Sequence, residues 1–297
     1  MPTLFALKER ITQVVQEKNN PVITDVASKL AEQQYNACFS AEQVKLWTQQ
    51  FKLSPIELAL ECLPLAACYA LVPISKFYVG AVAIGESGQF YFGANQEFTA
   101  QAIQQTVHAE QSAISHAWLA GEKAITDMVV NYTPCGHCRQ FMNELNSAKT
   151  LKIHLPHSQN NLLQQYLPDS FGPKDLNIKK VLFDPQQHTL QQQGDVLTQA
   201  AIQAAAHSYA PYSESLSGVA LQVDAQIICG RYAENAAFNP SFLPLQSALN
   251  YRRLSGKSGT EITRVVMAER KGTTSHRQMS EALVEGFLGL KLEYVEV

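Results

Sequence analysis

Two short stretches of the sequence together hold the parts of a catalytic metal site. His108-Ala109-Glu110 supplies an imidazole and a carboxylate, and Pro134-Cys135-Gly136-His137-Cys138 supplies two thiols three residues apart. Two cysteines and one histidine fill three positions around a tetrahedral zinc ion and leave the fourth for water, as in catalytic rather than structural zinc sites. We therefore predict one zinc ion per chain, held by His108, Cys135 and Cys138.

The remaining carboxylate, Glu110, has a role in such a site. Zinc lowers the pKa of its bound water to about 7, so hydroxide becomes available near neutrality. Glu110 is not needed as a ligand, and it can take the proton of that water and return it to a substrate. An amine on a ring leaves poorly as an anion, so a carboxylate that protonates both ring and leaving nitrogen suits a deamination. We predict Glu110 as the catalytic proton carrier.

The spacing of these residues indicates where the metal lies. Cys135 and Cys138 are one helical turn apart and share a helix face. His108 and Glu110 are two apart and point to nearly opposite sides of a helix interior. Both can serve one ion only if it lies off the end of their helix. We expect helices that begin near His108 and Cys135 and direct their positive ends at the site.

Two other interpretations of the cysteine pair remain open. A structural zinc knot needs a fourth ligand, and His137 lies between the cysteines, where it is poorly placed to complete the same site. A redox dithiol leaves His108 and Glu110 unexplained. For His116 and His137 we expect packed or surface positions.

The composition restricts the partners of the chain. The chain has 297 residues and a formal net charge of −3, which disfavours a partner with a long phosphate backbone. We expect a small substrate, no nucleic acid and no membrane partner. The first residues lack a secretory apolar segment, and the most apolar stretch, residues 62–74, is shorter than the roughly 20 residues that span a bilayer. We therefore expect a cytoplasmic protein.

The pattern of elements predicts an α/β protein made of two copies of one mixed-sheet, α-β-α domain. We expect a helical cap over residues 1–52, a catalytic domain over 53–183, a glutamine-rich linker at 184–190 and a second domain over 191–297. Residues 77–155 predict a β-β-α-β-α-β order of elements. Gly93-x-x-x-Glu97 and Gln111-Ser112-Ala113 recur as Gly230-x-x-x-Glu234 and Gln246-Ser247-Ala248.

The second copy lacks the metal-binding residues. Aligning the two Gln-Ser-Ala motifs places Leu243 at the position of His108 and Leu245 at that of Glu110, and no Pro-Cys-x-x-Cys follows. We interpret the second domain as a degenerate supporting or interface domain.

These motifs resemble the cytidine deaminase family, in its large two-domain, homodimeric bacterial form. His-x-Glu followed by Pro-Cys-x-x-Cys is the signature of zinc-dependent nucleobase deaminases. Pro134-Cys135-Gly136-x-Cys138-Arg139-Gln140, Pro73-x-Ser75-x-Phe77-x-Val79-Gly80-Ala81 and Asn95-x-Glu97 also match the family, and the resemblance covers nearly the whole chain. It implies hydrolysis of cytidine and 2′-deoxycytidine to uridine and 2′-deoxyuridine, with release of ammonia, in pyrimidine salvage.

The resemblance also implies a nucleoside pocket. Phe77 would pack against the pyrimidine, and Asn95 and Glu97 would hydrogen-bond the ribose hydroxyls, with Gln96 contributing at most its backbone. Small one-domain members have Cys-Ala-Glu-Arg where this chain has His-Ala-Glu-Gln, so Gln111 replaces an arginine that offsets a third thiolate.

In the large form a partner subunit completes the active site. Phe171 and residues 233–238 are the candidates for this cover, and ordinary loop packing is the alternative. Two rival functions remain open: a polynucleotide or adenosine deaminase, and a zinc-stabilised scaffold without activity.

Overall fold

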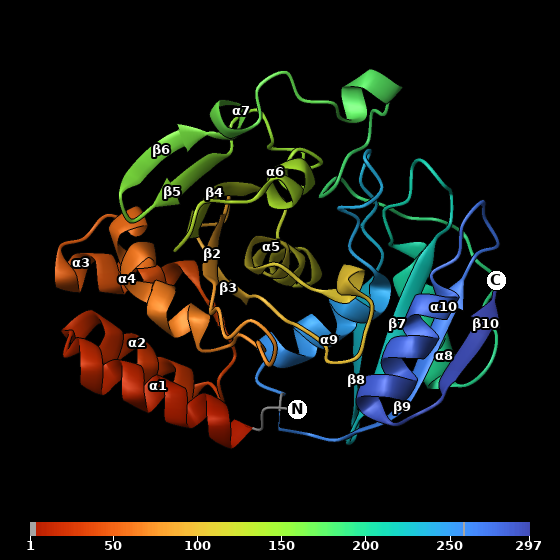
Figure 1. Ribbon diagram of the computed structural model, residues 1–297, viewed down its shortest axis with the longest axis horizontal. Helices are drawn as coiled ribbons and strands as arrows, with labels where there is room; N and C mark the ends of the chain where they lie inside the picture. Colours follow the sequence, from red (N-terminus) through yellow and green to blue (C-terminus); the bar gives the residue numbers. More distant parts are fainter. Residues whose placement is uncertain (1–3, 258) are drawn as a thin grey trace.

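The computed structural model describes residues 4–257 and 259–297 and contains two β-sheets, each covered by helices (Figure 1). The α-helices are α1 (Leu4–Lys18), α2 (Pro21–Glu32), α3 (Ala41–Phe51), α4 (Pro55–Ala67), α5 (Ala109–Leu119), α6 (Gly136–Met142), α7 (Leu163–Tyr166), α8 (Val196–Ala206), α9 (Pro244–Leu254) and α10 (Arg277–Leu283). The strands are β1 (Cys38–Phe39), β2 (Gly80–Gly85), β3 (Phe90–Ala94), β4 (Ile125–Val130), β5 (Lys152–Leu155), β6 (Ser158–Leu162), β7 (Ser217–Val223), β8 (Gln226–Arg231), β9 (Ile262–Glu269) and β10 (Leu292–Glu296). Shorter helical turns are η1 (Ile103–Gln105), η2 (Pro173–Leu176) and the π-turn η3 (Val284–Leu288).

The N-terminal helices form in part from capping signals in the sequence. Asn20 and Pro21 follow the end of α1 and begin α2. The Asn20 side chain accepts the N–H of Val22, and Pro21 occupies the first helical position. Ser54 and Glu57 form a capping box at the start of α4.

The first sheet has the strand order β1-β3-β2-β4-β5-β6. β2 is antiparallel to β3 and β4, and β4 is parallel to β5. The N-terminal cap contributes its own edge strand, because Cys38 of β1 pairs with Tyr91 of β3. Behind this pairing, the Phe39 ring packs edge-on against Trp47 and Phe92. The cap and the first sheet therefore share one hydrophobic core.

The second sheet repeats the first. Its order β10-β9-β7-β8 matches β5-β4-β2-β3, and its β9–β10 pair is again parallel. Helix α8 covers one face and α9 the other, as α4 and α5 do in the first copy. This arrangement confirms the predicted α/β fold with two copies of one domain.

The equivalent helices α5 and α9 lie side by side between the two sheets (Figure 1). The Ser112 hydroxyl donates to the Asn250 Oδ1 atom at 2.5 Å, and the Ser115 and Ser247 hydroxyls are 3.3 Å apart. One hydrophobic cluster continues across both helices. The second domain therefore supports the helix that begins beside His108.

A glycine in each copy allows the sheet to approach its helix closely. A Cβ atom on Gly93 would lie 2.2 Å from the Ala113 nitrogen of α5, and one on Gly230 would lie 2.1 Å from the Ala248 nitrogen of α9. No side chain fits at these distances, which explains why the Gly-x-x-x-Glu motif recurs with its glycine.

The connection between the copies, residues 177–195, runs through turns and irregular structure. Among the helices that the structure describes, none has the length and apolar content needed to span a bilayer.

Candidate active site

The predicted metal ligands lie at the beginnings of two helices. His108 is the N-cap of α5 and Cys135 is the N-cap of α6, both with extended backbone dihedrals. Because the backbone of His108 is extended and not helical, the rule that residues two apart in a helix point to opposite sides does not apply to His108 and Glu110. The prediction that helices begin near His108 and Cys135 is confirmed.

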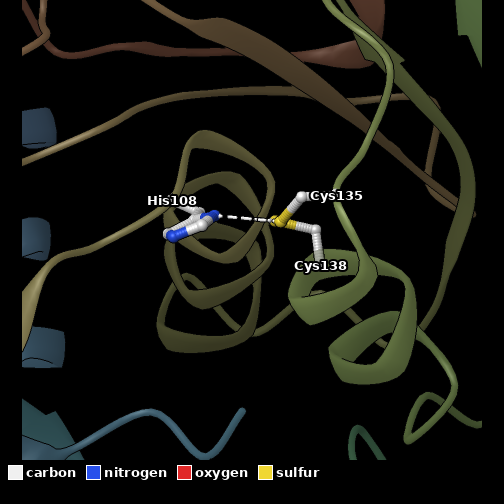
Figure 2. A group of neighbouring side chains, drawn as sticks. All are labelled: His108, Cys135 and Cys138. Atoms are coloured by element: carbon white, nitrogen blue, oxygen red, sulfur yellow. Dashed lines mark hydrogen bonds between the residues drawn. The ribbon is translucent and has the colours of Figure 1, made fainter. Parts of the chain in front are cut away.

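The three donor atoms are arranged as a zinc ion requires (Figure 2). His108 Nδ1 lies 3.4 Å from Cys135 Sγ and 3.3 Å from Cys138 Sγ, and the two sulfurs are 3.7 Å apart. Tetrahedral zinc with ordinary bond lengths places two sulfurs about 3.8 Å apart and a sulfur and a nitrogen about 3.6 Å apart. Within the described residues no fourth His, Cys, Asp or Glu joins this group. The donor set therefore fits zinc with one open position.

The two cysteines differ in protonation. A hydrogen bond from the Cys138 thiol, followed by one from His108, lowers the pKa of Cys135 to about 3 against the effect of burial. The bond to Cys135, together with burial, raises the pKa of Cys138 well above its usual value. Without a metal, Cys135 is therefore the more acidic thiol of the pair. Metal ligation requires both cysteines in the deprotonated form.

Glu110 lies beside the donor set without belonging to it. Its side chain is 5% exposed, and its carboxylate lies beside the Cys138 thiol. Burial is the main cause that raises its pKa, which the helix backbone and Cys138 partly oppose. A buried carboxylate at this position has the location that a proton carrier needs.

Two half-exposed aromatic rings lie near the ligand segment. The rings of Phe77 and Tyr132 are 4.5 Å apart and tilted by 38°, and both residues are 49% exposed. Tyr132 precedes Cys135 by three residues, so the pair lies beside the segment that carries this cysteine. The motifs indicated Phe77 but not Tyr132, although Tyr132 lies two residues before Pro134.

Asn95 and Glu97 support the loop that carries Phe77. Asn95 accepts the N–H of Val79 at 3.0 Å and donates to the Phe77 carbonyl at 2.9 Å. Glu97 Oε2 accepts the N–H groups of Ile74 and Ser75 at 2.9 and 3.0 Å. Burial opposes ionisation of Glu97, but the bonds from Ser75 and Ile74 outweigh it and hold the pKa below its usual value.

Two glutamines of the motifs reach across to the second domain. Gln96 pairs with Val107 through both backbone groups, and its side chain donates to Asn250 at 2.7 Å. Gln111 is buried, and its side chain donates to the Pro240 carbonyl at 2.8 Å. The glutamine that replaces the small members' arginine therefore holds a segment of the second domain, a role that sequence spacing did not reveal.

Two further histidines lie near the ligand helices. His137 stacks on the His108 ring at 4.7 Å, so it packs directly on a predicted ligand without joining the donor set. His116 is buried, and its Nδ1–H donates to the Phe92 carbonyl at 2.9 Å. His116 is thus a packed histidine, as expected.

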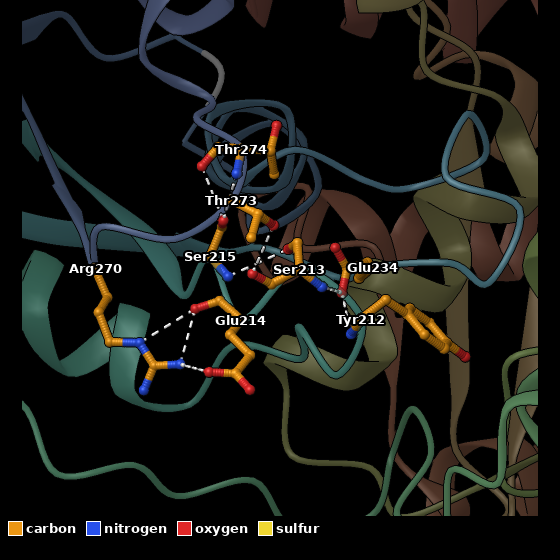
Figure 3. Close-up of polar contacts among 8 residues, drawn as sticks. All are labelled: Tyr212, Ser213, Glu214, Ser215, Glu234, Arg270, Thr273 and Thr274. Carbon is orange, nitrogen blue, oxygen red and sulfur yellow. Dashed lines mark hydrogen bonds and ion pairs between the residues drawn. The ribbon is translucent and has the colours of Figure 1, made fainter.

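The second domain has a carboxylate, Glu234, at the position of Glu97 (Figure 3). The position that corresponds to Phe77 is held by contacts within the second domain itself. Glu234 Oε2 accepts the N–H groups of Tyr212 and Ser213 at 2.8 and 3.1 Å. Ser215 occupies the position of Phe77, and its hydroxyl donates to the Thr274 carbonyl at 2.8 Å.

A neighbouring loop closes this position. The Thr273 hydroxyl donates to the Ser213 carbonyl at 3.1 Å, and the His276 ring stacks on Tyr232 at 4.0 Å. Leu243 caps α9 where His108 caps α5, and Leu245 is buried where Glu110 stands. The second copy thus has leucines at the positions of His108 and Glu110, and its residues 273 and 274 contact the segment that corresponds to the Phe77 loop.

Comparison with known proteins agrees with this site. Residues 53–154 and 163–281 match families described as the cytidine and deoxycytidylate deaminase zinc-binding region. The chain is 86% identical over its full length to cytidine deaminase of Actinobacillus pleuropneumoniae serotype 5b (strain L20), covering 100% of that protein. It is 65% identical to cytidine deaminase of Haemophilus ducreyi (strain 35000HP / ATCC 700724), with 100% of this chain and 99% of that protein covered.

Among solved structures, cytidine deaminase from Mycobacterium tuberculosis shares 29% identity over 39% of this chain and 96% of its own, with a TM-score of 0.36. The two matched zinc-binding regions and the full-length identity to the two relatives establish that this chain belongs to the cytidine deaminase family.

Proposed function

We propose that this chain hydrolyses cytidine and 2′-deoxycytidine to uridine and 2′-deoxyuridine, releases ammonia and so serves pyrimidine salvage. The observation that carries this function is the set of three donor atoms within 4.8 Å of one another beside the buried carboxylate of Glu110. When bound by His108, Cys135 and Cys138, zinc supplies hydroxide near neutral pH, because it lowers the pKa of water at its open position to about 7.

Glu110 moves the protons of the reaction. Its carboxylate accepts a proton from the attacking water and delivers it to the ring nitrogen next to the reacting carbon. The second proton of the same water then goes to the exocyclic amine, which leaves as neutral ammonia. The carboxylate is regenerated in each turnover, so one group serves both transfers.

The nucleoside is held by the first domain. Phe77, with Tyr132 at its side, offers an aromatic surface to the pyrimidine. Asn95 and Glu97 bind the ribose hydroxyls, and Gln96 keeps these two in place through its bonds to Val107 and Asn250. A sugar lacking hydroxyls would leave buried polar groups unpaired, which favours a nucleoside over the free base.

We assign catalysis to residues 53–183 and a supporting role to residues 191–297, with 1–52 as cap and 184–190 as linker. The leucines at the second domain's ligand positions and the contact of Thr274 with Ser215 support this division.

The active enzyme is a homodimer in which each chain completes the pocket of the other. Phe171 and Phe238 are 49% and 61% exposed, and each lies on a loop that hydrogen-bonds Gln140 of α6. Two large exposed aromatic side chains on loops held by one helix favour burial in a C2 interface. Analytical ultracentrifugation tests this: a monomer at assay concentrations would contradict it.

The cytoplasm is the proposed compartment. All six cysteines, each within the described part of the chain, are free thiols, and two of them are the proposed ligands. A reducing compartment preserves them. Detection of the protein in a periplasmic fraction, free of cytoplasmic markers, would contradict this.

One assay tests the function directly. Purified, zinc-quantified protein is mixed with cytidine, 2′-deoxycytidine, cytosine, adenosine and single-stranded RNA, and ammonia release is measured. We expect release from the two pyrimidine nucleosides at one zinc per chain. Release from RNA or adenosine alone would favour the polynucleotide or adenosine deaminase, and no release from any substrate would favour a scaffold.

A further inference from the structure

Helix α6 carries a metal-ligand pair at one end and holds two loops at the other. Cys135 and Cys138 lie in its first turn. Gln140 and Asn143, near its C-terminal end, donate to the Phe171 carbonyl at 3.0 and 2.9 Å. Any shift of this end therefore moves a loop that bears an exposed aromatic side chain.

The second loop belongs to the other domain. Residues 237–239, which we call the tip, are exposed, and Phe238 in its centre has a positive φ of 57°. The base of the tip is buried and fixed at both ends. Asn235 donates to the Gln140 carbonyl at 2.9 Å, and Gln111 donates to the Pro240 carbonyl at 2.8 Å.

Glu144, two residues beyond α6, makes the third contact to this base. Its Oε2 atom accepts the N–H of Ala236 at 3.0 Å. Its Oε1 atom accepts the hydroxyls of Tyr209 at 2.6 Å and Tyr212 at 2.5 Å. The Glu144 side chain is fully buried, so three donors from the second domain meet one carboxylate of the first.

The Glu144 carboxylate is buried with neutral hydrogen-bond partners. The bonds recorded for its carboxylate come from two phenols and one backbone N–H, all of them neutral groups. Burial, aided by the nearby carboxylate of Glu234, raises its pKa despite these bonds. Burying a charge without a cation costs stability, and the three donors around Glu144 offset part of that cost while fixing its position.

We propose that Glu144 is a positioning residue that acts in trans: it holds Ala236, and with it Phe238 at the tip, in the shape that completes the nucleoside pocket of a second copy of the chain. This inference rests on the dimeric active site of the proposed function. Glu144 does not touch the substrate. Its effect reaches the reaction through the tip that it fixes.

A buried carboxylate elsewhere in the first domain supplies the matched control. Glu122 is 9% exposed, and its carboxylate accepts the Tyr91 hydroxyl at 3.2 Å and the Lys123 N–H at 2.9 Å. It thus has the same kinds of donor as Glu144 but lies at the far end of α5, away from the tip.

The first experiment compares Glu144→Gln with Glu122→Gln in zinc content, melting temperature, KM and kcat for cytidine. A displaced tip weakens nucleoside binding, so we expect Glu144→Gln to retain zinc and raise KM about tenfold or more, with a smaller change in kcat. Glu122→Gln should lower the melting temperature without changing KM. Equal KM values for the two variants would overturn the inference.

Tyr212→Phe gives a milder variant if Glu144→Gln does not fold. It removes one donor from Glu144 Oε1 and leaves Tyr209 and Ala236 in place. The expected change is a smaller rise in KM. A KM equal to that of the wild type would count against the role of this cluster.

The second experiment tests action in trans with mixed dimers. Glu144→Gln chains are co-expressed with Glu110→Ala chains under different tags, and dimers carrying both tags are assayed far below KM. In such a dimer the Glu144→Gln chain still has Glu110, and its pocket is completed by the tip of the Glu110→Ala chain, in which Glu144 is intact. One of the two symmetric sites is therefore complete, and activity should reach about half that of the wild-type dimer. Activity no higher than that of the Glu144→Gln dimer would overturn the inference.

A parallel pair separates the two proposals. Phe238→Ala chains mixed with Glu110→Ala chains test completion of the pocket by the tip itself. If this pair recovers activity and the Glu144→Gln pair does not, the dimeric site stands and the role of Glu144 is wrong. If neither pair recovers activity, pocket completion in trans is wrong, and the inference fails with it.

Discussion

Glu97 and Glu234 occupy equivalent positions in the two domains and make the same pair of backbone hydrogen bonds. Each accepts, through Oε2, two consecutive N–H groups of the loop before the first central strand, at distances of 2.8 to 3.1 Å. Among the described residues, the donor set of His108, Cys135 and Cys138 lies in the domain of Glu97 and not in that of Glu234. The shared bonds are thus a property of the duplicated fold, and the sugar contact proposed for Glu97 is an addition to it.

Replacing Glu97 with Gln should weaken recognition of the sugar. The amide oxygen can take the place of Oε2 toward both N–H groups, but the amide nitrogen puts a donor where the carboxylate has its second acceptor. We expect kcat/KM for cytidine to fall by about 10- to 100-fold, which corresponds to the roughly 1–3 kcal/mol lost when a buried polar group is left unpaired.

A sugar without hydroxyls separates recognition from a structural effect. The variant and the wild type are compared on cytidine and on 2′,3′-dideoxycytidine. If Glu97 binds a hydroxyl, the wild type discriminates between the two substrates more strongly than the variant does. An equal ratio in both proteins would assign Glu97 to loop support alone.

The sequence predicted the parts of the fold and site that depend on local signals. The position of His108 relative to Glu110 required a helix start that the structure has, and the repeated Gly-x-x-x-Glu and Gln-Ser-Ala motifs indicated the duplicated domain. The loss of ligands in the second domain followed from Leu243 and Leu245 directly.

Features that depend on contacts between distant segments were not predictable in this way. The pairing of Cys38 with Tyr91 joins the cap to the sheet across 53 residues, and the bond from Gln111 to Pro240 spans 129. No periodicity or spacing encodes such contacts, because they arise from how the two domains pack. The contacts of Thr273 and Thr274 with residues 213–215 could not be predicted for the same reason.

Glu110→Ala should bind zinc as well as the wild type and lose nearly all turnover. The carboxylate lies outside the donor set but next to Cys138, so its removal leaves the ligands in place and removes the proton carrier. Zinc quantitation and a cytidine assay on the same preparation measure both quantities. Substantial turnover by the zinc-loaded variant would remove Glu110 from its proposed role.

Cys135→Ala should reduce metal retention. It deletes one of three donors and the more acidic thiol of the pair, so zinc should be lost on dialysis against a mild chelator. Cys229→Ala is the control, because Cys229 is a partly buried thiol of the second domain that lies outside the donor set. Equal zinc content in the two variants would contradict the ligand assignment.

Gly93→Ala should destabilise the protein. The added Cβ atom would meet the backbone of α5 at Ala113 and Ala109, neither of which can move without displacing the helix that follows His108. Overpacking of this kind costs about 1–3 kcal/mol, and we expect a matching fall in the free energy of unfolding.

Gly136→Ala provides the comparison for Gly93→Ala. A Cβ atom on Gly136 meets no atom within 4 Å, and the residue begins α6. This variant should unfold at a temperature equal to or slightly above that of the wild type, because alanine favours a helix over glycine. Equal destabilisation by both substitutions would refute the steric argument.

The buried His116 should make stability depend on pH between about 4 and 6.5. Burial lowers its pKa to about 4, although the bond to the Phe92 carbonyl acts in the opposite direction. Between these pH values the unfolded chain binds a proton that the folded chain does not, so stability falls as the pH falls through 6.5 and continues to fall until about 4. The full effect is about 3 kcal/mol, from about 2.5 pKa units.

His116→Asn isolates this contribution. The asparagine amide can still donate to the Phe92 carbonyl, but it does not titrate. We expect the free energy of unfolding of the wild type, relative to the variant, to decrease steadily from pH 7 to pH 4. Urea unfolding curves at closely spaced pH values measure this difference. A difference that is constant over the range would mean that His116 does not remain neutral in the folded protein, and the tight packing of α5 against β3 would then need another explanation.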